Sequence, residues 1–165
     1  MPRFQIAFRL LCSFVFIGTG CQPATSSAEM NNAQTLKHLV GPTGRKYWDE
    51  VYATDVDGHY QRSVNQDGRF ARCLQFDSSR RLMHYYYQDT VRLFDAGCNN
   101  DVQTNPDRFT IAGDTIRWLA NQTYVIKYMS EEIMVLKHVP STNPRAFDVY
   151  QKSAIQDKVV VACKP

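Results

Sequence analysis

The sequence has 165 residues, of which 44% are hydrophobic and 21% charged, and its formal net charge is +3. This length is enough for one domain with a hydrophobic core. The small net charge, carried by scattered basic residues, argues against nucleic acid as the main partner.

The first 20 residues predict a secretory signal. Arg3 and Arg9 precede an apolar run, Leu10 to Ile17, and the small residues GTG follow it. A basic start, a short apolar core and small residues form the layout of such a signal, and the run is too short to span a bilayer as a helix. Removal of residues 1–20 takes two arginines and no acids, so the net charge falls to +1.

The run IGTGC, which ends at Cys21, resembles the lipobox of bacterial lipoproteins. In that family the chain is cut before the cysteine, and the new terminal cysteine carries lipid. The resemblance implies a lipidated Cys21 that holds the protein on a membrane, since each buried methylene contributes about 0.8 kcal/mol. Gln22 after the cysteine implies the outer membrane of the cell envelope, with the domain facing the periplasm. The alternative is an ordinary cleaved signal in which Cys21 is an incidental thiol.

Residues 21–35 predict a flexible polar tether, because they are rich in Ser, Asn, Gln and Ala. Residues 36–165 are expected to form a single domain. A helical turn is expected only near Ala33 to Leu39. From residue 45 onward, aromatic and β-branched runs alternate with turn residues and predict strands at 45–53, 70–76, 81–87, 108–111, 115–119, 123–129, 133–139, 147–151 and 158–164.

These runs predict an all-β fold. Strands joined mostly in sequence order, with no helices between them, favour an antiparallel up-and-down meander that closes into a barrel of about eight strands, which removes exposed edges. A β-sandwich is the alternative. Period-two alternation puts Tyr124, Ile126 and Tyr128 on one face of their strand, and Met134, Leu136 and His138 on one face of the next.

Three cysteines remain once Cys12 leaves with the signal and Cys21 carries lipid. An oxidising compartment permits one disulfide and one free thiol among Cys73, Cys98 and Cys163. The sequence does not determine which two pair. We expect Cys98 to pair with Cys163, tying the chain end to a loop, and Cys73 to be a lone buried thiol in a strand.

The stretch from Lys46 to Tyr150 resembles the small lipocalin-like domains of bacteria, which often occur on lipoproteins. The resemblance lies in RKYWDEVY, in RCLQFDSSRRLMHYYY and above all in RFTIAGDTIRWLANQTYVIKYMSEEIMVLKH. It implies an up-and-down barrel able to hold one small apolar ligand. A competing resemblance is that of AGCNN, residues 96–100, to the Gly-Cys-Asn signature of META domains, which also occur on envelope lipoproteins.

Motifs of catalysis and metal binding are missing from the sequence. It has no G-x-S-x-G, S-x-x-K or H-E-x-x-H pattern and no phosphate-binding glycine loop. Asp55 and Asp57 lie in DVDG, which predicts a turn, because a calcium loop needs more oxygen ligands. The four histidines are isolated along the chain. We therefore expect no enzyme activity, no cofactor and no metal.

Arg72 is the most informative candidate for ligand binding. It shares a strand face with Phe70, Leu74 and Phe76, so a barrel interior there would contain a charge that needs an anionic partner, such as a ligand carboxylate or phosphate. His84 and Tyr86 would lie beside it, and Trp118 and Tyr124 would form apolar walls. In the alternative interpretation Arg72 reaches water near the barrel mouth, and the aromatic residues are core.

The leading hypothesis is a lipid-anchored, non-enzymatic barrel that binds a small amphipathic or apolar molecule. The alternative is a structural or interaction lipoprotein, for example an assembly factor or inhibitor, with a filled barrel and a partner surface on its loops. An enzyme is a third hypothesis, since a barrel can host a reaction without a recognisable motif.

Overall fold

The computed structural model describes residues 31–62, 72–89, 91–96, 105–119, 122–139 and 146–161. The expected signal and lipidation site, Phe70 and the expected Cys98–Cys163 disulfide lie outside the described residues. Cys73 is described and is a buried free thiol, which confirms the expectation for that residue.

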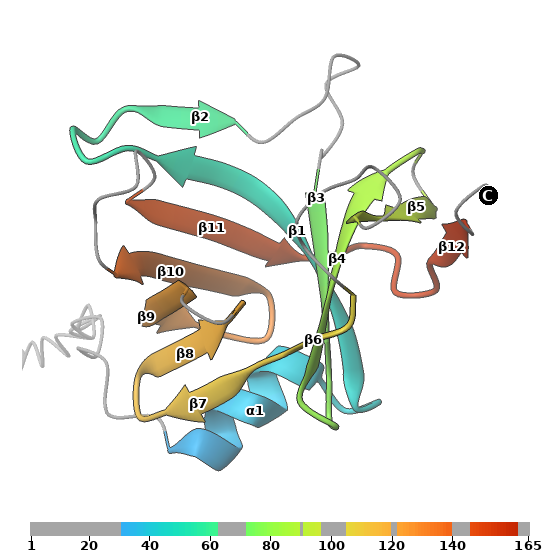
Figure 1. Ribbon diagram of the computed structural model, residues 1–165, viewed down its shortest axis with the longest axis horizontal. Helices are drawn as coiled ribbons and strands as arrows, with labels where there is room; N and C mark the ends of the chain where they lie inside the picture. Colours follow the sequence, from blue (N-terminus) through green and yellow to red (C-terminus); the bar gives the residue numbers. More distant parts are fainter. Residues whose placement is uncertain are drawn as a thin grey trace, which may run out of the picture.

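One helix and twelve strands make up the regular structure of the described residues. The helix α1 is Asn32–Val40. The strands are β1 Arg45–Thr54, β2 Tyr60–Arg62, β3 Arg72–Asp77, β4 Arg81–Tyr87, β5 Arg92–Asp95, β6 Asp107–Arg108, β7 Thr110–Ala112, β8 Thr115–Trp118, β9 Gln122–Met129, β10 Ile133–Val139, β11 Phe147–Lys152 and β12 Val159–Val161. Figure 1 shows a strongly curved sheet with α1 lying across its lower end.

The helix is longer than the single turn that the sequence predicts, and its first residues belong to the expected tether. Asn31 caps it, because its side-chain Oδ1 accepts a hydrogen bond from the backbone N–H of Gln34 at 2.8 Å. Gly41 ends it with a positive φ of 63°, which glycine adopts without strain. Leu39 and Val40 are buried, and the indole N–H of Trp48 donates to the carbonyl oxygen of Leu39 at 2.9 Å. The helix is therefore fastened to β1.

The strands form a single mixed sheet in the order β12-β5-β4-β3-β1-β11-β10-β9-β8-β7, with β2 paired to β1 and β6 paired to β4. The prediction of a mainly β fold is confirmed. The prediction of a purely antiparallel meander is wrong at the chain end, because β12 runs parallel to β5. After β11 the chain runs past Tyr47, whose backbone forms hydrogen bonds with Ser153 and Gln156. This path brings β12 alongside β5 with both strands running in the same direction.

All nine predicted strand runs overlap observed strands, with the run at 108–111 divided into β6 and β7 around Phe109. β2 and β5 are strands that the sequence did not predict. They have three and four residues, which is too short for alternation of apolar and polar residues to be recognised.

Alternation along the strands creates a separate hydrophobic cluster on each side of the sheet. The inner cluster includes Trp48 of β1 and Leu74 of β3, together with Leu39 of α1. Their strand neighbours Tyr47 and Cys73 belong to a smaller outer cluster with Tyr85 and Leu93. Successive side chains of a strand point to opposite faces, so both clusters follow from one sequence pattern.

The predicted face of β9 is correct for Tyr124 and Ile126, which are buried, but wrong for Tyr128, whose side chain is 55% exposed. The pairing of β9 with β10 shifts by one residue between Ile126 and Tyr128. An extra residue in one strand inverts the alternation beyond it. Tyr128 is turned outward for this reason, whereas Met134, Leu136 and His138 of β10 keep a common inner face.

Candidate functional site

The inner face of the sheet changes character from one end to the other. Near α1 the inward side chains are apolar: Trp48, Phe76, Leu82, Ile116, Ile126 and Leu136. The inward side chains become polar one or two inward positions farther along the same strands, and also on the adjacent β11. These polar residues are Glu50, Arg72, His84, Tyr124, His138 and Asp148. The strand registers place Tyr124 opposite His138, and Glu50 opposite Tyr150, which follows Asp148 on the same face of β11. The polar end of the interior is therefore assembled from six strands.

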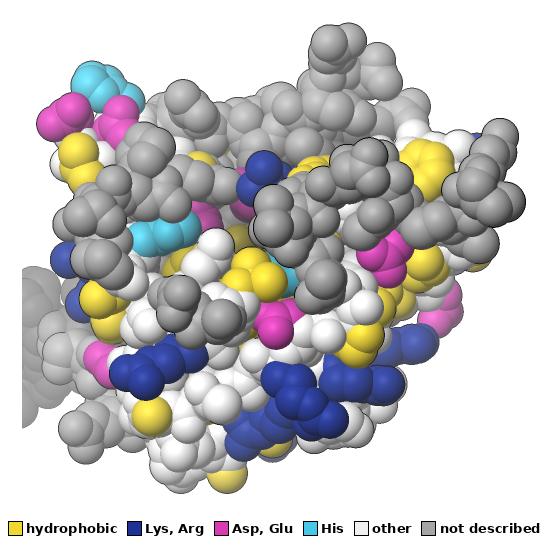
Figure 2. Space-filling model, viewed as in Figure 1, with side chains coloured by type: hydrophobic (Ala, Val, Ile, Leu, Met, Phe, Trp, Pro, Cys, Tyr) yellow, Lys and Arg dark blue, Asp and Glu magenta, His cyan; other side chains and the backbone are white. Residues whose placement is uncertain are grey.

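A cavity of about 280 Å³ lies at this polar end. All five residues predicted as ligand contacts line it: Arg72, His84, Tyr86, Trp118 and Tyr124. The structure therefore brings the predicted contacts together, and their role in binding stays a prediction. Figure 2, which has the same view as Figure 1, shows histidine and acidic side chains together at the upper left, over the turn between β1 and β2, and this group is separate from the cavity lining.

A continuous series of contacts runs along one wall of the cavity. The rings of Trp118 and Tyr124 are stacked, with centroids 4.1 Å apart, and the Tyr124 ring meets the imidazole of His138 edge-on at 4.7 Å. His138 Nε2 lies 2.8 Å from a carboxylate oxygen of Asp148, and the hydroxyl of Tyr150 donates to the same oxygen at 3.4 Å. These contacts hold each group in one orientation.

Arg72 lies at the exposed edge of the cavity. Its side chain is exposed and its guanidinium carbon is 5.9 Å from the centre of the Tyr86 ring. The interpretation in which Arg72 reaches water therefore fits the structure, and the interpretation of a charge sealed in an apolar interior does not. A guanidinium in water attracts an anion weakly, because solvent screens it.

His84 is held in place through its backbone by Asn105, which lies just before β6. The backbone N–H of His84 donates to Asn105 Oδ1 at 2.8 Å, and Asn105 Nδ2 donates to the His84 carbonyl oxygen at 2.6 Å. Asn105 Nδ2 also donates to Asp95 at 2.9 Å. One amide side chain thus joins β4 to the residues at the ends of β5 and β6, beside the cavity.

Sequence reasoning missed several residues of the cavity wall, most importantly Glu50, His138, Asp148 and Tyr150. The signal for Glu50 is its position two residues after Trp48, on the same face of β1. The signal for Asp148 and Tyr150 is their alternation with Val149 in β11. Alternation assigns these residues to a common face, but the level at which they meet depends on strand register.

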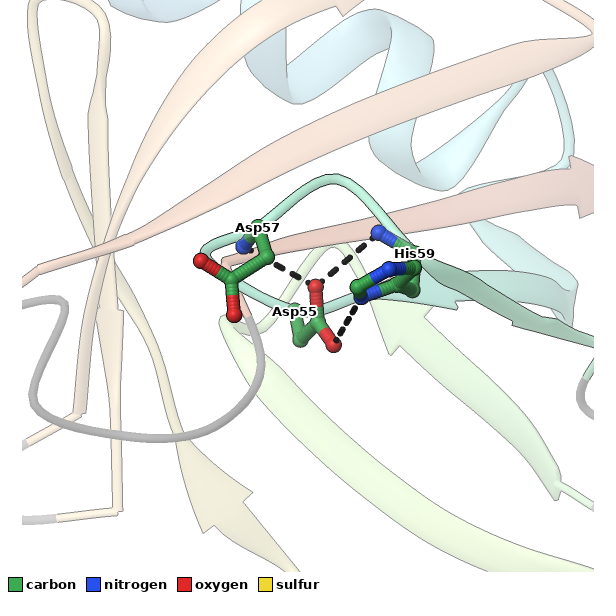
Figure 3. Close-up of side chains that lie close together, drawn as sticks. All are labelled: Asp55, Asp57 and His59. Carbon is green, nitrogen blue, oxygen red and sulfur yellow. Dashed lines mark hydrogen bonds and ion pairs between the residues drawn. The ribbon is translucent and has the colours of Figure 1, made fainter.

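A second group of polar residues lies in the turn between β1 and β2, where Asp55, Asp57 and His59 each place one possible metal-ligating atom within 4.8 Å of the others (Figure 3). Asp55 Oδ1 accepts hydrogen bonds from the backbone N–H groups of Asp57 and His59, both at 3.0 Å. Asp55 Oδ2 lies 3.2 Å from His59 Nδ1. These bonds are those of a polar turn, as predicted for DVDG.

Cys73 faces away from the inner cluster and packs in the outer one, with its side chain fully buried. Burial raises the pKa of its thiol well above the usual value. A thiol held protonated in this way is a poor nucleophile, so Cys73 contributes to packing.

No helix among the described residues is long and apolar enough to cross a membrane. A scan against protein-family models gave no match, and a search of curated proteins gave none either.

Proposed function

We propose that this chain is a non-enzymatic binding protein of the bacterial cell envelope, which carries a lipocalin-like barrel and holds one small amphipathic molecule in its interior cavity. Cys21 carries the lipid anchor, and the domain faces the periplasm from the outer membrane. The observation that carries the proposal is the cavity of about 280 Å³ lined by the five predicted contact residues.

Two strand pairings support closure of the curved sheet into a barrel. β7 pairs with β8 near one end of the strand order, and β6 pairs with β4 near the other. Only Phe109 separates β6 from β7. A single bent strand that pairs on both sides would join β8 to β4, and the resulting ring would contain eight strands if β6 and β7 count as one.

The size and lining of the cavity support a small ligand. Its volume lies near the lower limit of about 300 Å³ for typical ligand pockets. Aromatic walls remove an apolar group from water, and a few polar groups orient its other end. The alternative hypothesis, a structural or interaction protein, predicts an interior filled by side chains. The presence of a cavity does not support that hypothesis.

The proposal is tested by asking what the intact protein retains. The full chain is expressed in a bacterium, purified from the envelope in lipid nanodiscs, and its small molecules are extracted and identified by mass spectrometry. Ala96 lines the cavity and is 1% exposed, so Ala96→Phe is designed to fill it. Ala112→Phe makes the same change at an exposed position in β7 and serves as the control.

We expect a molecule that is present with the parent chain and with Ala112→Phe and is lost with Ala96→Phe. If all three samples retain the same molecules, or none, the proposed cavity function is wrong. The mass of the N-terminal peptide tests the anchor separately, because a lipidated Cys21 adds the mass of its acyl chains and Cys21→Ser removes that addition.

A further inference from the structure

Among the described residues, five arginines gather on the outer side of the sheet at the end next to α1. They are Arg45, Arg80, Arg81, Arg108 and Arg117, and we call them the arginine surface. Arg81 of β4 is the direct cross-strand partner of Arg108 in β6. Arg45 of β1 is the cross-strand partner of Asp77 in β3. Figure 2 shows Lys and Arg side chains close together at the lower right, around the lower ends of β3 and β4.

Alternation along β4, β6 and β8 turns the arginines of these strands outward. In each case the next residue of the chain belongs to the inner cluster: Leu82, Phe109 and Trp118. Successive side chains point to opposite faces, and the three arginines are accordingly exposed. Arg117 lies near Arg108 because its cross-strand partner, Thr110, is only two residues beyond Arg108.

Acidic residues offset only part of this charge. The carboxylate of Asp77 accepts from Arg81 Nε at 2.6 Å, and this is the one ion pair that the described residues give to the arginine surface. Asp107 accepts from the backbone N–H groups of Arg108 and Leu119. Even with Asp114 at the tip of the β7–β8 hairpin included, five guanidinium groups face three carboxylates, so a net positive charge remains.

Two features of the arginine surface are unfavourable without a bound anion. Arg81 and Arg108 are directly opposite each other, and like charges in that arrangement destabilise a strand pair. Arg80 has a φ of 63°, in the left-handed region that favours glycine. Its guanidinium carbon lies 5.6 Å from the centre of the Phe109 ring, which keeps it beside Arg108. An anion bound across these side chains would relieve the repulsion.

The arginine surface lies beside the point where the N-terminal segment enters the domain. Asn32, the first residue of α1, accepts a hydrogen bond at 2.9 Å from the backbone N–H of Gly113, in the hairpin that carries Arg117. The chain from Cys21 to Asn31 spans at most about 36 Å when fully extended. A lipid on Cys21 would therefore keep this end of the domain close to a bilayer.

Anionic headgroups match this surface in charge. One exposed guanidinium attracts an anion weakly, but each basic residue close to an anionic leaflet favours the bound state about fivefold. Several such contacts act together, and attachment to the same membrane makes their formation intramolecular. Guanidinium groups also form paired hydrogen bonds with phosphate oxygens.

We infer that the arginine surface binds anionic phospholipid headgroups and holds the domain against the membrane that carries its lipid anchor. This inference rests on the anchor of the proposed function and is independent of the cavity ligand. Arg72 at the cavity edge and Asp77 beside Arg81 are the two ends of β3, about 17 Å apart along the strand. The docking surface and the cavity edge are thus separate.

The test measures how close the domain lies to the bilayer. The full chain is inserted into vesicles of phosphatidylcholine, with or without phosphatidylglycerol, that contain a trace of dansyl-labelled lipid. The two tryptophans of the chain, Trp48 and Trp118, are the donors for energy transfer to the dansyl headgroups. We expect more transfer with phosphatidylglycerol at about 0.1 M salt, and loss of this difference at about 1 M salt, because salt screens exposed charges.

One variant and a matched control locate the contact. Arg108→Gln should lower the ratio of docked to undocked domains on phosphatidylglycerol vesicles about fivefold. Arg92→Gln makes the same change at an exposed residue of β5 that pairs with Asp89, outside the arginine surface, and should leave the ratio unchanged. If Arg108→Gln does not fold, Arg117→Gln is expected to give the same decrease.

The outcomes separate this inference from the function on which it rests. If Cys21 is lipidated and transfer is equal in both kinds of vesicle, the anchor stands and membrane docking is overturned; an acidic protein then becomes the partner to seek. A response to phosphatidylglycerol that persists in both Arg108→Gln and Arg117→Gln also overturns it. If the N-terminal peptide carries no lipid, the anchor and the docking fail together, and the cavity is judged separately by Ala96→Phe.

Discussion

Lys46 shows how a single charged residue is accommodated inside this protein. Its side chain is 5% exposed and its ammonium group donates to the carbonyl oxygens of His38, at 3.1 Å, and of Glu131. The same nitrogen lies 4.0 Å from the centre of the Trp48 ring. Burial lowers the pKa of Lys46 from 10.5 to about 8, with a smaller contribution from Lys152, while Glu131 and Glu132 oppose the shift.

The lowered pKa of Lys46 predicts a specific dependence of stability on pH. Below pH 8 both states are protonated, and the folded state carries the cost of a desolvated charge. Between about pH 8 and pH 10.5 the unfolded state binds more protons at this residue than the folded state does. The contribution of Lys46 to the free energy of unfolding therefore increases as the pH rises, which stabilises the folded state. In urea unfolding, the parent chain should gain stability relative to Lys46→Met from pH 7 to pH 10.

The control for this prediction is Lys127→Met, which changes an exposed lysine of β9. Its difference from the parent chain should show a much weaker dependence on pH in that range. If the difference in free energy of unfolding between the parent chain and Lys46→Met stays constant from pH 7 to pH 10, burial does not lower the pKa of the Lys46 amine.

At the scale of elements, α1 is stabilised by tertiary contacts more than by its own sequence. It has nine residues, which is too short for a stable isolated helix in water. Leu39 is completely buried in the inner cluster and its carbonyl oxygen accepts from Trp48. At the other end of the helix, Asn32 Oδ1 accepts from the backbone N–H of Gly113, in the turn between β7 and β8, at 2.9 Å. The helix thus connects β1 with the β7–β8 hairpin.

Replacement of Leu39 by Ala should reduce the free energy of unfolding by about 2–5 kcal/mol, because it removes a fully buried side chain and leaves a cavity. Lys37→Ala, at an exposed position of the same helix, should change it by less than about 0.5 kcal/mol. Both values come from urea or thermal unfolding. Similar losses for the two variants would mean that α1 does not dock on the inner cluster.

At the scale of the whole molecule, the two sides of the sheet make different contacts. The inner side holds the cavity, and the outer side joins β1, β3, β4 and β5 to the segment that follows β11. On that outer side the Tyr87 hydroxyl donates to Asp49 and lies 3.4 Å from the hydroxyl oxygen of Ser153, and the Lys158 ammonium lies 4.6 Å from the centre of the Tyr87 ring. These contacts stabilise the sheet on the side away from the inner cluster.

The buried tyrosines on the outer side of the sheet lead us to expect that the protein becomes less stable at alkaline pH. Burial raises the pKa of Tyr87 and Tyr85 above the usual value of 10.0. Above pH 10 the unfolded state therefore releases protons that the folded state keeps, and the free energy of unfolding falls. The fall from pH 10 to pH 11.5 in urea unfolding should be smaller for Tyr87→Phe than for the parent chain.

Tyr128→Phe is the matched control, because Tyr128 is 55% exposed and lies outside both clusters. It should follow the parent chain through the alkaline range. An equal fall for Tyr87→Phe and the parent chain would contradict a role for this phenol in alkaline unfolding.

The amino-acid sequence by itself determined where most strands lie and which residues share a face. Alternation is a local property, so RKYWDEVYA and IMVLKHV were recognised as strands, and Trp118 and Tyr124 were assigned to the interior. Local pattern also located the buried thiol of Cys73 and the polar turn at Asp55. It failed for β2 and β5, which are too short to show a period, and for Tyr128, since a bulge has no signature in hydrophobicity.

Only the tertiary structure decided which of these residues meet. Asp148 and His138 are ten positions apart, and Glu50 is a hundred positions before Tyr150; they become neighbours through the registers of β1, β10 and β11. The parallel pairing of β12 with β5 likewise depends on the path of the chain past Tyr47. Register results from the packing of all strands at once, and a one-residue shift moves every side chain to the other face. For that physical reason the sequence assigned residues to the inner wall, and the folded sheet determined the charge and shape of the cavity.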